Sequence, residues 1–221
     1  MAPGPHVFGD GRIGVWIINN ENLTDKLKHV LPRLRGVAEI TDVFLPREAT
    51  LAHKQQVSAA GLYSALYETP PHGMSATDYS ARAIKDVDRL KAGALELNIE
   101  GLADEALDPY IRTVVRNIRK VKPYLRLRIN VVPWKGQFLP ADLFAADFQL
   151  YLIAQCFLGN MDARVAENEL VRDLTDYGID EEKVSVMYCA MVGVPRVRAL
   201  PQIRYRGSIF SDDLLLDAGL I

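Results

Sequence analysis

The sequence carries little net charge and few cysteines. Its 26 Lys and Arg almost balance 28 Asp and Glu, so the formal net charge is −2 and bulk electrostatics indicates neither nucleic acid nor a membrane surface as a partner. The 2 cysteines, Cys156 and Cys189, both lie in apolar strand-like runs. This placement favours two buried thiols over a disulfide framework.

Long apolar runs and targeting signals are also missing. No stretch approaches the roughly 18 apolar residues of a membrane span. The first residues, MAPGPHVFGDG, show neither a basic segment nor an apolar segment of a secretory signal. We therefore expect a protein that is made in the cytoplasm without a signal peptide and has no membrane partner.

Most of the common catalytic and cofactor motifs are absent. The 4 histidines (His6, His29, His53 and His72) are scattered, and no spacing among them matches a metal site. No GxSxG, P-loop or CxxC occurs. We expect no metal and no cofactor.

The most informative feature that is present is a matched pair of segments, Leu95–Glu100 and Leu125–Asn130. Both alternate apolar with polar residues, which predicts strands. The polar positions are complementary, because the first segment carries Glu, Asn and Glu and the second carries Arg, Arg and Asn. A helix pattern over Asp108–Lys122 separates them, so the unit is strand, helix and parallel strand.

The rest of the chain repeats this alternation. Helix patterns fit 22–35, 49–60, 75–92, 108–122, 141–146 and 162–177, with Asp108-Pro109 as the predicted start of the fourth. Eight runs read as strands: Ile13–Asn19, Glu39–Pro46, Leu62–Glu68, Ala94–Glu100, Leu125–Pro133, Phe148–Cys156, Val184–Ala190 and Gly207–Ser211.

Eight strands that alternate with helices predict an α/β protein with a single closed (β/α)8 TIM-like barrel over residues 1–221. The alternative, an open doubly wound sheet, would want a Gly-rich turn after the first strand, and Asn19-Asn20-Glu21-Asn22 is not one. Residues 1–11 form an extended N-terminal arm in this prediction. The seventh helix is replaced by an irregular basic crossover loop, 193–206, because Pro195 and Pro201 interrupt it.

Function in such barrels is placed at the carboxyl ends of the strands. Glu100 at the end of the fourth strand, with Asp212 or Asp213 after the eighth, is the candidate catalytic set. Glu100 has an alternative interpretation as a rim acid paired with Lys135 or Arg47. The candidate substrate-binding residues at the other strand ends are Asn19, Asn20, Glu48, Glu68, Asn98, Asn130, Trp134, Gln155 and Tyr188.

Glu96 lies two residues deeper than Asn98 on the inward face, so it is predicted to be buried. A buried carboxylate needs a partner, and Arg126 or Arg128 on the adjacent strand supplies one. We interpret Glu96, Arg126 and Arg128 as a structural ion pair. Acidic strand ends beside a tryptophan are typical of a carbohydrate site, because aromatic rings bind sugars and paired carboxylates cleave glycosidic bonds.

The pattern resembles the glycoside hydrolase barrels, in particular the family 25 lysozyme-type barrels. The matching positions are Asn19 or Asn20, then Asn98-Ile99-Glu100, then Asp212 or Asp213, with amides at two positions where that family has acids. The resemblance implies a barrel that acts on or binds cell-wall glycan. The combination of a small barrel with a proline-rich start is also similar to minor tail proteins of phages that infect actinobacteria.

Two hypotheses follow. The first is a virion-associated, glycoside-hydrolase-like barrel of the phage minor tail type, which has a structural role or binds cell-surface glycan. The alternative is an active lysozyme-like hydrolase that uses Glu100 with Asp212 or Asp213. We expect the Arg196–Arg206 loop and the termini to contact other tail proteins, although this loop also suits an anionic polymer. Nucleic acid is not the expected partner.

Overall fold

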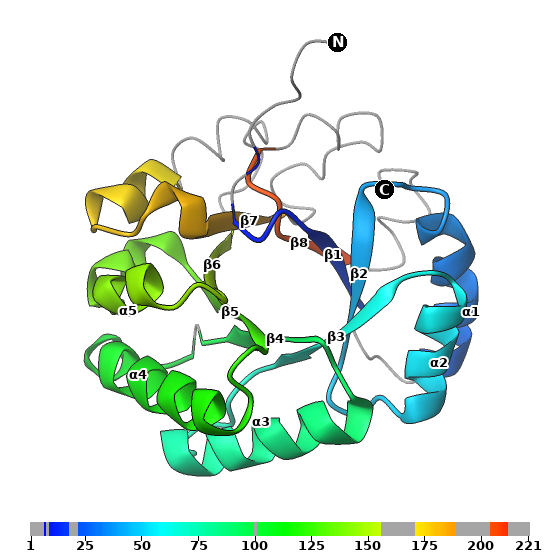
Figure 1. Ribbon diagram of the computed structural model, residues 1–221, viewed down its shortest axis with the longest axis horizontal. Helices are drawn as coiled ribbons and strands as arrows, with labels where there is room; N and C mark the ends of the chain where they lie inside the picture. Colours follow the sequence, from blue (N-terminus) through cyan, green and yellow to red (C-terminus); the bar gives the residue numbers. More distant parts are fainter. Residues whose placement is uncertain are drawn as a thin grey trace.

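The computed structural model describes residues 7, 9–17, 22–99, 101–155, 171–188 and 204–211. Within these ranges, eight parallel strands follow one another around a closed barrel, and the last strand pairs with the first. Figure 1 shows the ring of strands with helices outside it. The predicted (β/α)8 barrel is confirmed. In the described part of the chain, no helix has the length and apolar character needed to span a membrane.

Each predicted strand contains the observed one, and the observed strands are shorter by one to three residues. Their bounds are β1 (Ile13–Ile17), β2 (Ile40–Leu45), β3 (Tyr63–Glu68), β4 (Ala94–Asn98), β5 (Arg126–Val131), β6 (Leu150–Gln155), β7 (Val184–Tyr188) and β8 (Ser208–Ser211).

Five α-helices and two short 3-10 helices have their bounds in the described ranges. They are α1 (Leu23–Leu34), α2 (Leu51–Ala59), α3 (Ala76–Leu90), α4 (Asp104–Val121), α5 (Ala141–Ala146), η1 (Pro133–Phe138) and η2 (Glu181–Lys183). The predicted helix over 162–177 is described only from Val171 onward. Most of the predicted arm (1–11) and of the crossover loop (193–206), and both cysteines, lie outside the described residues.

The predicted start of α4 at Asp108-Pro109 is wrong. The helix begins one turn earlier, at Asp104, and Pro109 lies inside it. The extra turn places Leu107, which is wholly buried, on the same apolar stripe as Ile111. Asp104 and Glu105 in the first turn also face the positive end of the helix dipole. Burial and charge together outweigh the one backbone hydrogen bond that a proline forgoes.

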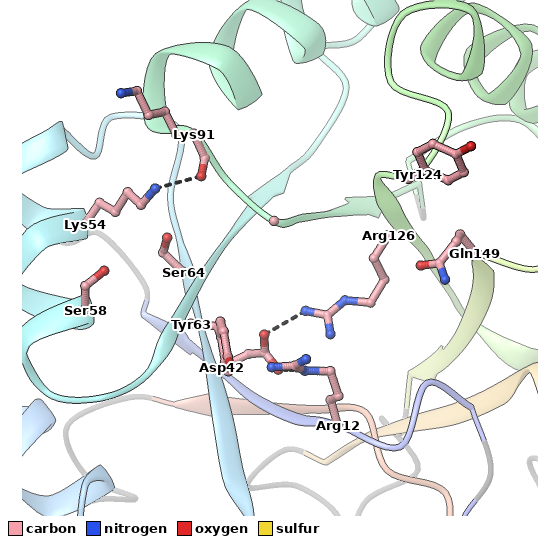
Figure 2. Close-up of a pocket in the computed structure, with 11 residues that line it drawn as sticks. Arg12, Asp42, Lys54, Ser58, Tyr63, Ser64, Lys91, Tyr124, Arg126 and Gln149 are labelled. Carbon is pink, nitrogen blue, oxygen red and sulfur yellow. Dashed lines mark hydrogen bonds and ion pairs between the residues drawn. The ribbon is translucent and has the colours of Figure 1, made fainter.

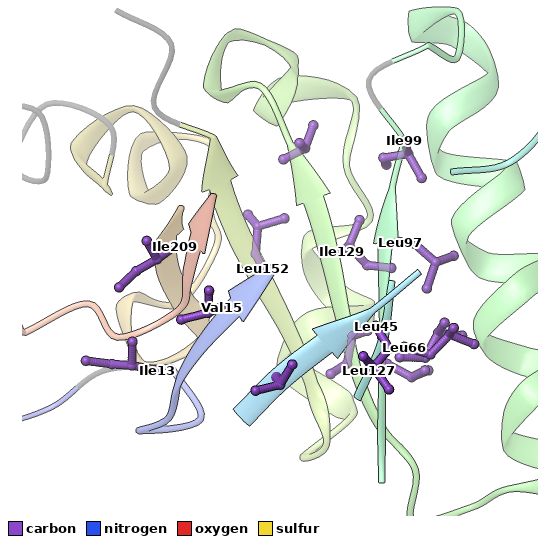
Figure 3. Packing of buried hydrophobic residues seen from close by; sticks show 14 of the residues in the cluster. Ile13, Val15, Leu45, Leu66, Leu97, Ile99, Leu127, Ile129, Leu152 and Ile209 are labelled. Carbon is purple, nitrogen blue, oxygen red and sulfur yellow. The ribbon is translucent and has the colours of Figure 1, made fainter. Parts of the chain in front are cut away.

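Alternation along the strands separates two cores. The outward positions are apolar and pack under the helices, as Leu97, Ile129 and Leu152 show in Figure 3. Each of these three side chains is almost wholly removed from water. Burial of that kind contributes about 1.5–3 kcal/mol per large aliphatic side chain, so this outer layer supplies most of the driving force for closing the barrel.

The inward positions carry a buried charge network centred on Arg128. Its side chain is fully buried, and its Nη2 lies 2.8 Å from a carboxylate oxygen of Asp10, which enters from the N-terminal segment. On the other side, Nη1 lies 3.5 Å from Glu96 Oε2. Glu96 also accepts hydrogen bonds from Asn130 at 2.8 Å and from Ser208 at 2.7 Å. Burial raises the pKa of Glu96, although Arg128 opposes the rise.

A second layer of charges lies nearer the amino ends of the strands. The sequence left Arg126 and Arg128 as alternative partners of Glu96, and the structure places only Arg128 against it. Arg126 instead donates to Asp42 Oδ1 at 2.7 Å and lies 3.3 Å from Asp10. Burial acts to raise the pKa of Asp42, but Arg126 and the neighbouring arginines outweigh burial and lower it.

An aromatic ring fills the space beside this network. Phe44 points inward from β2 and is fully buried, and the Arg128 guanidinium carbon lies 4.9 Å from the centre of its ring. On the adjacent strand β1, the position in contact with this ring is Gly14. A Cβ atom at Gly14 would come within 2.2 Å of the Phe44 ring, so only glycine leaves enough room there.

This close approach gives a prediction. We expect Gly14→Ala to lower the free energy of unfolding by about 1–3 kcal/mol, because the ring must move within a packed core that also holds Arg128. Gly93→Ala is the control, since a Cβ at Gly93 would meet nothing within 4 Å. Urea unfolding of both variants measures the effect, and equal stability of the two would contradict this description of the interior.

Candidate functional site

A polar cavity lies at the carboxyl ends of β2 and β3. Its volume is about 550 Å³. That volume is within the usual range for small-molecule sites. The residues that line it are Pro46, Arg47, Glu48, Tyr67, Glu68, Thr69, Pro71 and Arg82.

Glu68, the last residue of β3, is the central group of this cavity. The residue is 3% exposed, and its Oε2 accepts a hydrogen bond of 3.2 Å from Arg82 of α3. Its Oε1 is buried, and the buried Tyr79 hydroxyl interacts with the same carboxyl. Burial raises the pKa of Glu68 to about 7, since the opposing charge of Arg82 is partly offset by Asp86. At neutral pH this carboxyl is therefore present in both protonation states.

Helix α3 holds the wall of the cavity in place. Asp86 accepts from Arg47 Nε at 3.0 Å and from Arg89 Nε at 3.1 Å. Arg89 also donates to the backbone carbonyls of Arg47 and Ala49. The loop after β2, which carries Arg47 and Glu48, is thus fixed to α3 by charged hydrogen bonds, which are stronger than neutral ones.

An aromatic pair forms the inner side of the cavity. The rings of Trp16 and Tyr67 are stacked, with centroids 4.4 Å apart and an interplanar angle of 8°. Trp16 is buried inside the barrel, while Tyr67 is half-buried and reaches the cavity. Tyr67 therefore offers an aromatic surface that is supported from within the barrel.

A second cavity of about 310 Å³ adjoins the first, because Thr69 lines both. It lies between the ends of β3 and β4, and His72 and Asn98 are among the residues that line it. Asn98 Oδ1 accepts a hydrogen bond of 3.0 Å from Gln155 of β6. The two cavities together follow the rim of the barrel from β2 to β4.

The predicted substrate-binding residues are only partly brought together. Glu48 and Glu68 line the larger cavity and Asn98 lines the smaller. Asn130 and Gln155 are buried inside the barrel, and Tyr188 is buried in the outer core. Asn19, Asn20, Glu100, Asp212 and Asp213 lie outside the described residues, as does the side chain of Trp134.

Sequence reasoning missed Arg82, Tyr67 and Trp16. The alternation of inward and outward side chains along a strand could have identified the two aromatic residues, because both lie on inward positions near strand ends. The same parity turns Glu68 outward, toward α3, rather than into the barrel. Arg82 lies within a helix pattern, and its contact with Glu68 has no signal in the sequence. No group of three or more potential metal ligands occurs in the described part of the chain.

The raised pKa of Glu68 predicts a pH-dependent stability. The folded protein keeps a proton that the unfolded chain releases near pH 4.5, so stability falls as the pH rises from about 4.5 to 7. Relative to Glu68→Gln, we expect the wild type to lose about 3 kcal/mol over this window. Urea unfolding at pH 4.5, 6 and 8 measures the difference. The exposed Glu105→Gln is the control, and a difference for Glu68→Gln that is constant with pH would contradict the assignment.

No protein-family model matches the chain, and no curated protein matches it. Solved structures do match. Active domain 2 of a Pyrococcus furiosus chitinase is 11% identical with a TM-score of 0.62, over 94% of this chain and 84% of that one. A deoxyribose phosphate aldolase from Aeropyrum pernix is 13% identical with a TM-score of 0.59, over 91% and 85%.

The Bacillus cereus spore cortex-lytic enzyme SleL is 13% identical with a TM-score of 0.54, and the match covers 82% of this chain and 52% of that one. At these identities the likeness establishes the barrel fold alone. The similar structures include both glycan-cleaving enzymes and aldolases, and the fold is therefore shared by proteins with different chemistry.

Proposed function

We propose that the chain is a glycan-binding barrel that holds a sugar in the cavity around Glu68. The observation that carries the proposal is a buried carboxyl with a pKa of about 7 that lines a polar cavity at the carboxyl ends of the strands. Sugar hydroxyls both donate and accept hydrogen bonds. Arg47, Glu48 and Thr69 line the same cavity as Glu68 and offer both donors and acceptors to such hydroxyls.

The adjoining cavities favour an oligosaccharide over a single sugar. One ring placed against Tyr67 leaves the smaller cavity beyond Thr69 for a neighbouring ring. Aromatic rings contribute apolar contact to sugar faces, while charged side chains orient the hydroxyls. The chitinase and the cortex-lytic enzyme with the same fold support a glycan as the ligand class.

Hydrolysis is a second candidate function, and the protonation of Glu68 favours it. A general acid works best when its pKa is close to the operating pH. Glu68 meets this condition, and Glu48 lines the same cavity. Glu100, with Asp212 or Asp213, stays the sequence-based candidate set for the carboxylates of such a reaction.

The place of action is a further part of the proposal. A glycan-binding barrel of the phage minor tail type would contact cell-surface glycan from a virion, with the Arg196–Arg206 loop and the termini against other tail proteins. This part rests on the resemblance to minor tail proteins, which is a small barrel with a proline-rich start. Mass spectrometry of purified virions tests this location. If the protein is absent from the virions, the virion-associated role is contradicted.

The binding proposal predicts that Glu68→Ala weakens binding of a chito-oligosaccharide at least about ten-fold, because a buried hydrogen-bonding group is lost. Isothermal titration calorimetry with chitotetraose and with soluble peptidoglycan fragments measures it. Glu39→Ala, at the opposite end of β2, is the control. Binding of both glycans by Glu68→Ala at wild-type affinity would overturn the proposal, as would absence of binding by the wild type.

The same glycans separate binding from hydrolysis. Glu68→Gln keeps the shape and an acceptor oxygen but cannot give up a proton, so binding should persist while any cleavage stops. Equal cleavage by the wild type and Glu68→Gln would exclude Glu68 as the acid. Equal cleavage by Glu100→Gln would likewise remove Glu100 from a catalytic role.

A further inference from the structure

A third cavity, of about 460 Å³, lies at the opposite end of the barrel, where the strands begin. Tyr63 starts β3, Arg126 starts β5, and Gln149 directly precedes β6. Figure 2 shows the side chains around it, with Arg12, Asp42 and Arg126 gathered on one side and Lys54 on the other. This cavity shares no lining residue with the proposed glycan site.

The single carboxylate that lines this cavity is already fully engaged. Asp42 accepts from Arg12 Nε at 2.8 Å and from Arg126 Nη2 at 2.7 Å. It also accepts from the Thr41 hydroxyl at 2.7 Å. Its charge is therefore compensated within the protein, and a cationic ligand would find no free carboxylate there.

The charged groups of this cavity that keep hydrogen-bonding capacity are donors. The two terminal nitrogens of Arg12 and the Nη1 of Arg126 donate to no residue that the structure describes. Lys54 Nζ makes one hydrogen bond, of 2.8 Å to the Lys91 carbonyl, which leaves two of its three N–H groups. Three cationic side chains, from the segment before β1, from α2 and from β5, thus face a cavity with surplus donors.

Two tyrosine rings border the same cavity. Tyr63 is 64% exposed and Tyr124 is 79% exposed. Exposed aromatic rings beside a cationic cavity are typical of binding surfaces, because they supply apolar contact next to charged hydrogen bonds. Arg12 is held against Tyr63, with its guanidinium carbon 4.4 Å from the ring centre.

We propose that this cavity is a second ligand site that binds a phosphate group, either as free phosphate or as the ester of a small sugar. A guanidinium fork pairs with phosphate oxygens in two parallel hydrogen bonds, and Arg12 presents such a fork. Lys54 and the serines Ser58 and Ser64 then suit the hydroxyls or a second oxygen of the ligand.

The test is calorimetric titration of the full chain with inorganic phosphate, with glucose 1-phosphate and with glucose. We expect saturable binding of one or both phosphates below about 10 mM and none of glucose. Preference for glucose 1-phosphate identifies an ester as the ligand, and equal binding identifies the free anion.

Lys54→Gln and Arg12→Lys should each weaken phosphate binding about ten-fold, the second because it keeps the charge but removes the fork. Lys85→Gln, an exposed lysine on α3, is the matched control. Thermal unfolding of each variant verifies the fold. Absence of saturable binding, or binding that neither Lys54→Gln nor Arg12→Lys weakens, would overturn the proposal. Neither result depends on the glycan site.

Discussion

The buried guanidinium of Arg128 is the constraint on which the interior of the barrel depends. A charge with no exposed surface must be compensated by neighbours, because its desolvation costs several kcal/mol. Asp10 compensates it from the N-terminal segment and Glu96 from the adjacent strand. Because Arg128 needs Asp10 as a partner, the segment before β1 is held against the inside of the barrel. The Phe44 ring packs against the Arg128 guanidinium, and it fits beside β1 because residue 14 is glycine.

This network gives the two ends of the barrel different chemistry. At the amino ends of the strands, Asp42 is paired with Arg12 and Arg126, and the remaining N–H donors of these arginines are available to a ligand. At the carboxyl ends, Glu68 lies outside the network, on the side of β3 that faces α3, where it forms an ion pair with Arg82. Its carboxyl is therefore the group that keeps a proton near neutral pH.

The barrel could be predicted because its signals are local. Strand parity and helix periodicity each depend on residues close together in the sequence, and the eight strands follow from them. The pairing of Glu96 with an arginine also followed from parity, but the choice of Arg128 and the part played by Asp10 did not. Asp10 lies 118 residues from Arg128, and no local pattern records that contact. The same holds for Arg82 and Glu68, so the candidate site could be predicted only in part.

The most direct test of this account is the pKa of Glu68 itself. Carbon-13 NMR of the labelled side-chain carboxyl, followed from pH 4 to 9, reads the titration of that one group. We expect a midpoint of about 7, because burial outweighs the charge of Arg82. A midpoint near 4.5, the ordinary value, would contradict it and would remove the basis for placing the functional site at this cavity.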